Sequence, residues 1–190
     1  MKRRLAAALV LLAAVPIALA ARVPQNPFAS KPAKEHALLQ QLAGTWKASF
    51  KFLMPGMPGA GSGAGAPTAT ETDELLGELW VVARYDDPGM MGGRFSGAEL
   101  LGYDPAKKKY VSAWADNQST ELALQEGTYD AATRTLTLSG ESSDPMSGQK
   151  GTVRTVVRWS DDDHRSQTMF VPGPGGKEMQ LFEITYERAK

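Results

Sequence analysis

Residues 44–52 read GTWKASFKF, and this stretch decides the fold. From Trp46 to Phe52 the even positions are apolar and the odd positions are Lys or Ser, which is the period-two alternation of a half-buried strand. Arg188 lies two residues from the chain end, in the last segment with strand composition. A Trp that opens the first strand and an Arg on the last strand favour a β-barrel closed by pairing between these two strands.

The rest of the chain repeats this pattern without helices between the strands. Turn signals recur at intervals of about 8–12 residues, so neighbouring strands are expected to be antiparallel. About ten strands curl readily, and closure removes exposed sheet edges. The sequence therefore predicts an all-β fold, a single antiparallel up-and-down β-barrel; a two-sheet sandwich is the alternative, but its crossings need longer connections. The nine further expected strands are 68–76, 79–85, 94–103, 109–117, 120–129, 134–140, 152–160, 165–171 and 178–188.

One short helix is expected before the barrel, over residues 34–43. Its apolar positions Ala37, Leu38 and Leu42 form a stripe, and Gly44 ends it. A helix of two to three turns is marginal alone, so we expect it to plug one end of the barrel. The Gly/Pro/Ala-rich residues 54–67 are expected to form a long loop.

The first twenty residues have the pattern of a secretory signal peptide. Residues 2–4 are basic, residues 5–17 are apolar, and Ala18-Leu19-Ala20 fits a cleavage site. The apolar run of roughly 16 residues is shorter than the ~20 that span a bilayer, although an uncleaved anchor is the alternative. We expect a bacterial protein exported to the periplasm or the medium, with no stable membrane insertion after the signal is removed.

Three segments follow from these patterns: a signal peptide over 1–20, a flexible linker over 21–33 and a calycin-like barrel domain over 34–190. The full chain has 21 Lys and Arg and 21 Asp and Glu, so loss of the leader's three cations leaves a net charge of −3. No basic cluster interleaved with aromatics is present, which argues against nucleic-acid binding. The chain has no Cys, which excludes disulfides and thiol chemistry.

A set of short motifs makes the chain resemble the bacterial domain-of-unknown-function family DUF1579, which is grouped with calycin-like barrels. The resemblance spans residues 34–188 and implies a fold rather than an activity. The motifs are 36–39 HALL, 42–46 LAGTW, 101–105 LGYDP, 110–116 YVSAWAD, 126–127 EG, 161–165 DDDHR and 186–188 YER. A more distant similarity to lipocalins and fatty-acid-binding proteins implies that Arg188 stacks on Trp46 and closes the barrel end.

The candidate ligand-binding residues are aromatic side chains and one carboxylate that would line the barrel interior if their strand faces point inward. Asp116 shares a strand face with Tyr110 and Trp114, and an aromatic interior with one carboxylate suits an amphipathic ligand. Glu71, Asp73, Glu99, Asp116 and Glu183 all lie in expected strands, and we expect them mainly on the outer face as solubilising charges. The ligand-binding candidates are Phe50, Phe52, Tyr103, Trp114 and Asp116, beside the structural pair Trp46 and Arg188.

No catalytic, metal or cofactor site is expected. His36 lies on the short helix, where we expect it to cap the barrel mouth, so neither it nor His164 suits a haem. The run Asp161-Asp162-Asp163-His164 fits a solvated turn better than a metal site. The sequence also lacks a Gly-x-Ser-x-Gly nucleophile motif and a phosphate-binding loop.

Three functions remain open. The first is an exported barrel that binds a small apolar or amphipathic molecule, without catalysis. The second is a structural or protein-interaction barrel with a filled interior and an exposed apolar patch. The third is a carboxylate-dependent hydrolase or isomerase, which would need an inward Asp or Glu with a raised pKa beside a donor.

Overall fold

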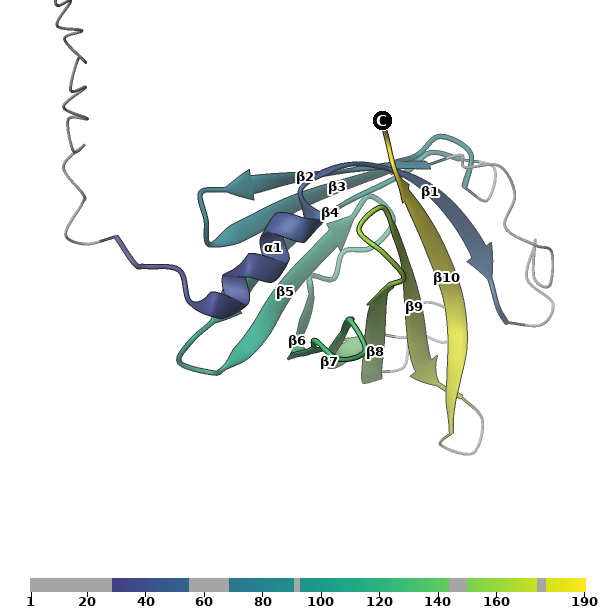
Figure 1. The fold of residues 1–190 in the computed structure, drawn as a ribbon. Coiled ribbons are helices and arrows are strands. Elements are labelled where there is room, and N and C mark those ends of the chain that lie inside the picture. Colours follow the sequence, from purple (N-terminus) through teal and green to yellow (C-terminus); the bar gives the residue numbers. More distant parts are fainter. Residues whose placement is uncertain (1–28, 55–68, 91–92, 144–149, 174–176) are drawn as a thin grey trace, which may run out of the picture. The chain divides into compact units, whose positions relative to one another are not determined.

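A computed structural model describes residues 29–54, 69–90, 93–143, 150–173 and 177–190. Each strand in it pairs antiparallel with the next, and β1 also pairs with β10, so the sheet is a closed ten-stranded barrel (Figure 1). The all-β up-and-down fold is confirmed. The strands are β1 Gly44–Phe52, β2 Ala69–Leu76, β3 Trp80–Asp87, β4 Phe95–Asp104, β5 Lys109–Asp116, β6 Ala123–Asp130, β7 Thr135–Ser143, β8 Lys150–Trp159, β9 His164–Pro172 and β10 Glu178–Arg188.

The first and last strands close the barrel over seven paired residues. The register runs from Trp46 opposite Arg188 to Phe52 opposite Phe182. The Ala189 amide then donates to the Thr45 carbonyl at 2.8 Å. These contacts rule out the two-sheet sandwich, which would leave β1 and β10 as unpaired edges or place them in different sheets.

A short helix packs at one end of the barrel. It consists of a 3-10 turn, Lys34–His36, and α1, Ala37–Leu42, which lies against β2 and β3. Leu39 is fully buried in the core at this end, and the Trp46 indole nitrogen donates to the Leu42 carbonyl at 2.8 Å. Among the described residues, no helix is long and apolar enough to cross a membrane. The leader, residues 21–28 of the expected linker and residues 55–67 of the expected loop lie outside the described residues.

The inner wall carries acidic side chains as well as apolar ones. In β2, buried Ala69, Glu71 and Asp73 alternate with more exposed residues. Glu99 of β4 also points to the interior, where it lines a cavity. The expectation that these acids lie mainly outside is therefore wrong for Glu71, Asp73 and Glu99. It holds for Glu183, whose carboxylate meets Lys51 at 3.4 Å.

Candidate binding site inside the barrel

Arg165 is the centre of a charged cluster inside the barrel. Its guanidinium donates to a Glu71 carboxylate oxygen and, at 3.0 Å, to Oδ2 of Asp73. Glu71 also accepts a hydrogen bond of 3.0 Å from the Tyr186 hydroxyl. The Arg165 side chain is 4% exposed, and its two carboxylate partners are nearly as buried. A charge this deep requires paired partners, since an isolated one would lose its hydration without compensation.

The strand order explains how Arg165 reaches those acids. It starts on β9, and Glu71 and Asp73 lie on β2, so β10 and β1 stand between them. Tyr186 on β10 and Trp46 on β1 supply the rings over which the guanidinium passes, with centroids at 4.5 Å and 4.4 Å. The Arg165 side chain thereby ties four adjacent strands together from the inside.

Burial changes the proton affinity of two carboxyl groups in the cluster. Burial, followed by the charge of Glu71, raises the pKa of Asp73 to about 8, although Arg165 acts in the opposite direction. Burial also raises the pKa of Glu99, against the effect of the hydrogen bond that it accepts from Ser112 Oγ. Arg165 therefore pairs with Glu71 and Asp73 in a cluster where burial favours the protonated forms of Asp73 and Glu99.

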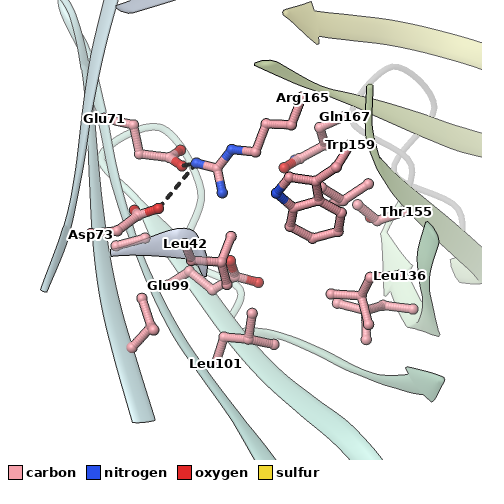
Figure 2. A pocket seen from close by; sticks show the side chains of 14 residues that line it. Leu42, Glu71, Asp73, Glu99, Leu101, Leu136, Thr155, Trp159, Arg165 and Gln167 are labelled. Carbon is pink, nitrogen blue, oxygen red and sulfur yellow. Dashed lines mark hydrogen bonds and ion pairs between the residues drawn. The ribbon is translucent and has the colours of Figure 1, made fainter. Parts of the chain in front are cut away.

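A small cavity lies beside this cluster, below the helix (Figure 2). Its volume is about 30 Å³, counted as room for the centres of water-sized molecules. One side is polar and the other is built from branched aliphatic side chains. The lining residues are Leu42, Glu71, Asp73, Val81, Ala83, Glu99, Leu101, Leu136, Leu138, Thr155, Val157, Trp159, Arg165 and Gln167.

Three buried polar atoms of lining residues have no hydrogen-bond partner within the described part of the chain. They are Oδ1 of Asp73, Nε1 of Trp159 and Nε of Arg165. The three residues are 3–6% exposed. In Figure 2 the indole nitrogen of Trp159 faces the space between its ring and the acids. Each such atom costs about 1–3 kcal/mol if it stays unpaired, so three around one cavity indicate a site that accepts a polar guest.

Of the ligand-binding residues expected from sequence, Phe50, Phe52 and Trp114 lie on the inner wall but outside this cavity. Phe50 contacts Phe52 edge-on at 4.8 Å and belongs to the aromatic cluster around Trp46. Trp114 stacks on Phe95 at 6.3 Å and covers Gly97, where a Cβ would lie 2.2 Å from the indole.

Tyr103 and Asp116 also lie outside the cavity, and they lie apart from each other. Tyr103 packs at the helix end, edge-on to His36 at 5.7 Å and to Tyr110 at 5.1 Å. Asp116 accepts from the Trp114 indole at 2.9 Å and from two backbone amides of the next loop at 2.8–2.9 Å. Its carboxylate therefore shapes the β5–β6 turn. The structure does not bring the five expected residues together into one pocket.

Sequence reasoning missed Arg165, Trp159 and the inward acids for a definite reason. Outward Thr70, Thr72 and Glu74 are as polar as Glu71 and Asp73, so the alternation in β2 does not mark an inner face. The pairing of residues between neighbouring strands would have identified the inward acids. Glu71 lies opposite Trp46, the residue most clearly expected inside, and partners directly opposite share a face.

Arg188 occupies the rim of the barrel. Its guanidinium lies 4.1 Å from the Trp46 ring centroid and donates to the Ala43 and Gln41 carbonyls, both at 2.8 Å. Gly44 has a φ of +135°, and a Cβ there would lie 2.6 Å from Nη1 of Arg188. The Gly-Thr-Trp sequence thus provides both the ring for Arg188 and the open space next to it.

Both histidines have structural partners. His36 is buried, and its Nδ1 accepts from the Ala33 amide at 2.9 Å, so it caps its own helix rather than a strand end. His164 pairs with Asp161 at 2.8 Å within the β8–β9 turn. In the described ranges, no group of three or more His, Asp or Glu side chains could hold a metal ion.

Comparison with known proteins gives a family but no activity. No curated protein matches the chain. The model of a family described as a protein of unknown function, DUF1579, matches residues 31–188, which is most of the chain and all ten strands. The chain therefore belongs to the DUF1579 family.

Proposed function

We propose that this barrel binds a small polar molecule in the cavity beside Arg165. The observation that carries the proposal is the set of three buried, unpartnered polar atoms on Asp73, Trp159 and Arg165. Trp159 Nε1 and Arg165 Nε are donors, so the ligand must offer an acceptor. Oδ1 of Asp73 belongs to a carboxyl group with a pKa of about 8, so at neutral pH this atom can carry the proton and either donate or accept.

The size of the cavity narrows the ligand further. A volume of about 30 Å³ for the centres of water-sized molecules holds two or so waters, since one needs roughly 10–15 Å³. Pockets for drug-sized molecules measure about 300–1,000 Å³. These numbers favour a ligand of a few non-hydrogen atoms over the larger apolar or amphipathic molecule that the aromatic pattern suggests.

The charge of the cavity favours a neutral ligand. Arg165 forms an ion pair with Glu71, and burial raises the pKa of Asp73 to about 8 and the pKa of Glu99 above its usual range. A charged ligand would add an uncompensated ion to a buried site, which is costly. A primary amide or a short diol has the required donor and acceptor without a net charge.

Two measurements test this proposal. Native mass spectrometry of protein purified from its own host should reveal a small bound molecule. Thermal unfolding with acetamide or ethylene glycol as probes should show a concentration-dependent rise in Tm, because a ligand that binds only the folded state stabilises it.

Matched variants locate the site. Trp159→Phe removes the indole donor from the cavity and should abolish the rise in Tm, whereas Trp80→Phe makes the same change on the outer wall and should preserve it. If no molecule co-purifies and no probe raises Tm, the proposal fails, and the small cavity then favours the filled structural barrel.

A second candidate function is acid–base catalysis by Asp73. Its pKa of about 8 and its hydrogen bond with Arg165 are the arrangement expected for a carboxylate-dependent hydrolase or isomerase. NMR of the co-purified molecule incubated with the protein would reveal conversion. Asp73→Asn should then stop conversion while the molecule still binds; a molecule that stays unchanged removes this candidate.

We also propose that the protein is exported and cleaved after Ala20, since residues 1–20 join a basic start, an apolar run and a small-residue cleavage pattern. Fractionation of the host should place the protein outside the cytoplasm, with an intact mass that begins at Ala21. Ala20→Arg should leave the full-length chain, and a protein that keeps residues 1–20 in every fraction would contradict cleavage.

A further inference from the structure

One part of the outer wall is apolar, although the outer face of a barrel in water should be polar. All four exposed large hydrophobic residues in the described part of the chain lie on strands β2–β6 or directly before β6. They are Leu76 at 60% exposure, Leu100 at 39%, Leu122 at 58% and Leu124 at 59%. Single exposed leucines are ordinary, but four on one part of the outer wall form an exposed apolar surface.

The strand register places two of these leucines, Leu100 and Leu124, in one continuous row. Val82 lies opposite Leu100, Leu100 opposite Ala113, and Ala113 opposite Leu124, which crosses β3, β4, β5 and β6 (Figure 1). The adjacent row has Ala98 opposite Ala115. We call these two rows, with the four leucines, the apolar wall.

The rest of the outer surface is different. The outward positions of β7 to β10 and β1 are chiefly Thr, Ser, Lys, Arg, Gln and Glu. The two middle strands of the apolar wall, β4 and β5, are largely apolar on both faces, a composition typical of strands that are covered on both sides.

We propose that the apolar wall pairs with the same wall of a second copy of this chain. The two rows contain no charged side chain between Val82 and Leu124, and the flanking charges, Glu74, Arg84 and Glu126, have both signs. Two identical uncharged walls meet without burying an unpaired charge. A partner steered by charge, or an anionic membrane surface, would instead select a charged face.

The shape of the wall is also complementary to itself. Leu100 and Leu124 stand on both sides of Ala113, while Ala98 and Ala115 leave a low floor beside them. In a dimer with two-fold symmetry, the leucines of each copy can pack onto the alanines of the other. Each contact then occurs twice, once on each side of the two-fold axis.

The size of the wall predicts a weak pair. Four strands spaced ~4.8 Å apart and about five residues of ~3.3 Å along each strand give roughly 300 Å² per copy. A standard stable interface buries about 800 Å² per partner. We therefore expect a dimer that dissociates on dilution within the range of about 1 µM to 1 mM.

Sedimentation velocity of the purified protein across that concentration range tests the proposal. The sedimentation coefficient should rise from the monomer to the dimer value as concentration increases. Leu124→Lys should raise the dimer dissociation constant at least tenfold. Thr128→Lys places the same charge on an exposed position of the same strand, outside the apolar wall, and should leave the dissociation constant unchanged.

Other outcomes overturn the inference. A protein that stays monomeric at 1 mM, or a dimer that Leu124→Lys does not weaken, excludes self-association through this wall. Flotation with phosphatidylcholine vesicles that depends on Leu124, by a protein that remains monomeric, would assign the wall to lipid. Trp159→Phe should dimerise normally, so failure of the proposed ligand site and failure of the dimer are separate results.

Discussion

Arg165 and Arg188 both lie over the indole ring of Trp46, one inside the barrel and one at its rim. Arg165 is 4% exposed and bonds to two carboxylates, whereas Arg188 is 27% exposed and bonds mainly to backbone carbonyls. The aromatic contact is nearly the same, at 4.4 Å and 4.1 Å. Their difference is therefore the surroundings: the counter-charges of Arg165 are buried with it, whereas Arg188 and its partner Asp163, at 3.4 Å, are partly exposed to water.

A third arginine, Arg154, makes the same kinds of contact as Arg165 but is not buried. Arg154, on the outer face of β8, donates to Glu178 at 2.6 Å and lies 3.9 Å from the Phe170 ring centroid. It has a carboxylate and an aromatic ring, as Arg165 does, but its side chain is 30% exposed. If burial decides the energetic role, these similar contact sets should have very different effects when removed.

The largest effect is expected for Arg165→Met. This change leaves Glu71 and Asp73 buried without their cation, and loss of one partner of a buried ion pair costs about 3–5 kcal/mol. Urea unfolding at neutral pH measures the loss. Adding Glu71→Gln and Asp73→Asn to Arg165→Met should recover most of it, because no buried charge then remains; no recovery would show that packing, and not charge, dominates.

Arg188→Ala should be intermediate, with a loss of about 2 kcal/mol from the ring contact and the charged hydrogen bonds to carbonyls. Gly44→Ala should also destabilise the fold, since its Cβ would meet the Arg188 guanidinium. Because the two sites share one contact, the double variant should lose less than the sum of the single losses. Strict additivity in thermal unfolding would contradict this coupling.

The pH dependence of stability should depend on Asp73, whose pKa differs between the folded and the unfolded chain. Its pKa is about 8 in the folded protein against an ordinary value of 3.8, so the unfolded chain releases the proton at lower pH. Stability should therefore fall as pH rises from about 4 to about 8 and level off above that. Asp73→Asn should remove this part of the decline in urea unfolding at pH 5 and pH 8. An unchanged slope would point to Glu99 instead, which Glu99→Gln would test.

The smallest effect is expected for Arg154→Ala, at about 0–1 kcal/mol, because exposed ion pairs are weakened by water and salt. The same urea titration used for Arg165→Met measures it. A loss as large as that of Arg165→Met would mean that contact geometry, and not burial, sets the energetic role of these arginines.

The barrel could be predicted from the sequence, because the alternation of residues 44–52, the turn signals and the lack of intervening helices are local properties. The pair of Trp46 and Arg188 was predicted from the family resemblance, and the short helix before β1 from its apolar stripe. The binding site was not predicted. Aromatic residues such as Phe50 and Trp114 attract attention in a sequence, but here Phe50 packs on Phe182 and Trp114 on Phe95, outside the cavity.

What the sequence determined by itself was the number and order of the strands and the meeting of the two chain ends, since periodicity and turn chemistry act over a few residues. Only the tertiary structure decided which face of each polar strand turns inward, and therefore that Arg165 from β9 meets Glu71 and Asp73 from β2. Those residues are more than ninety positions apart. Closure of the sheet brings them together, and no local pattern encodes that distance.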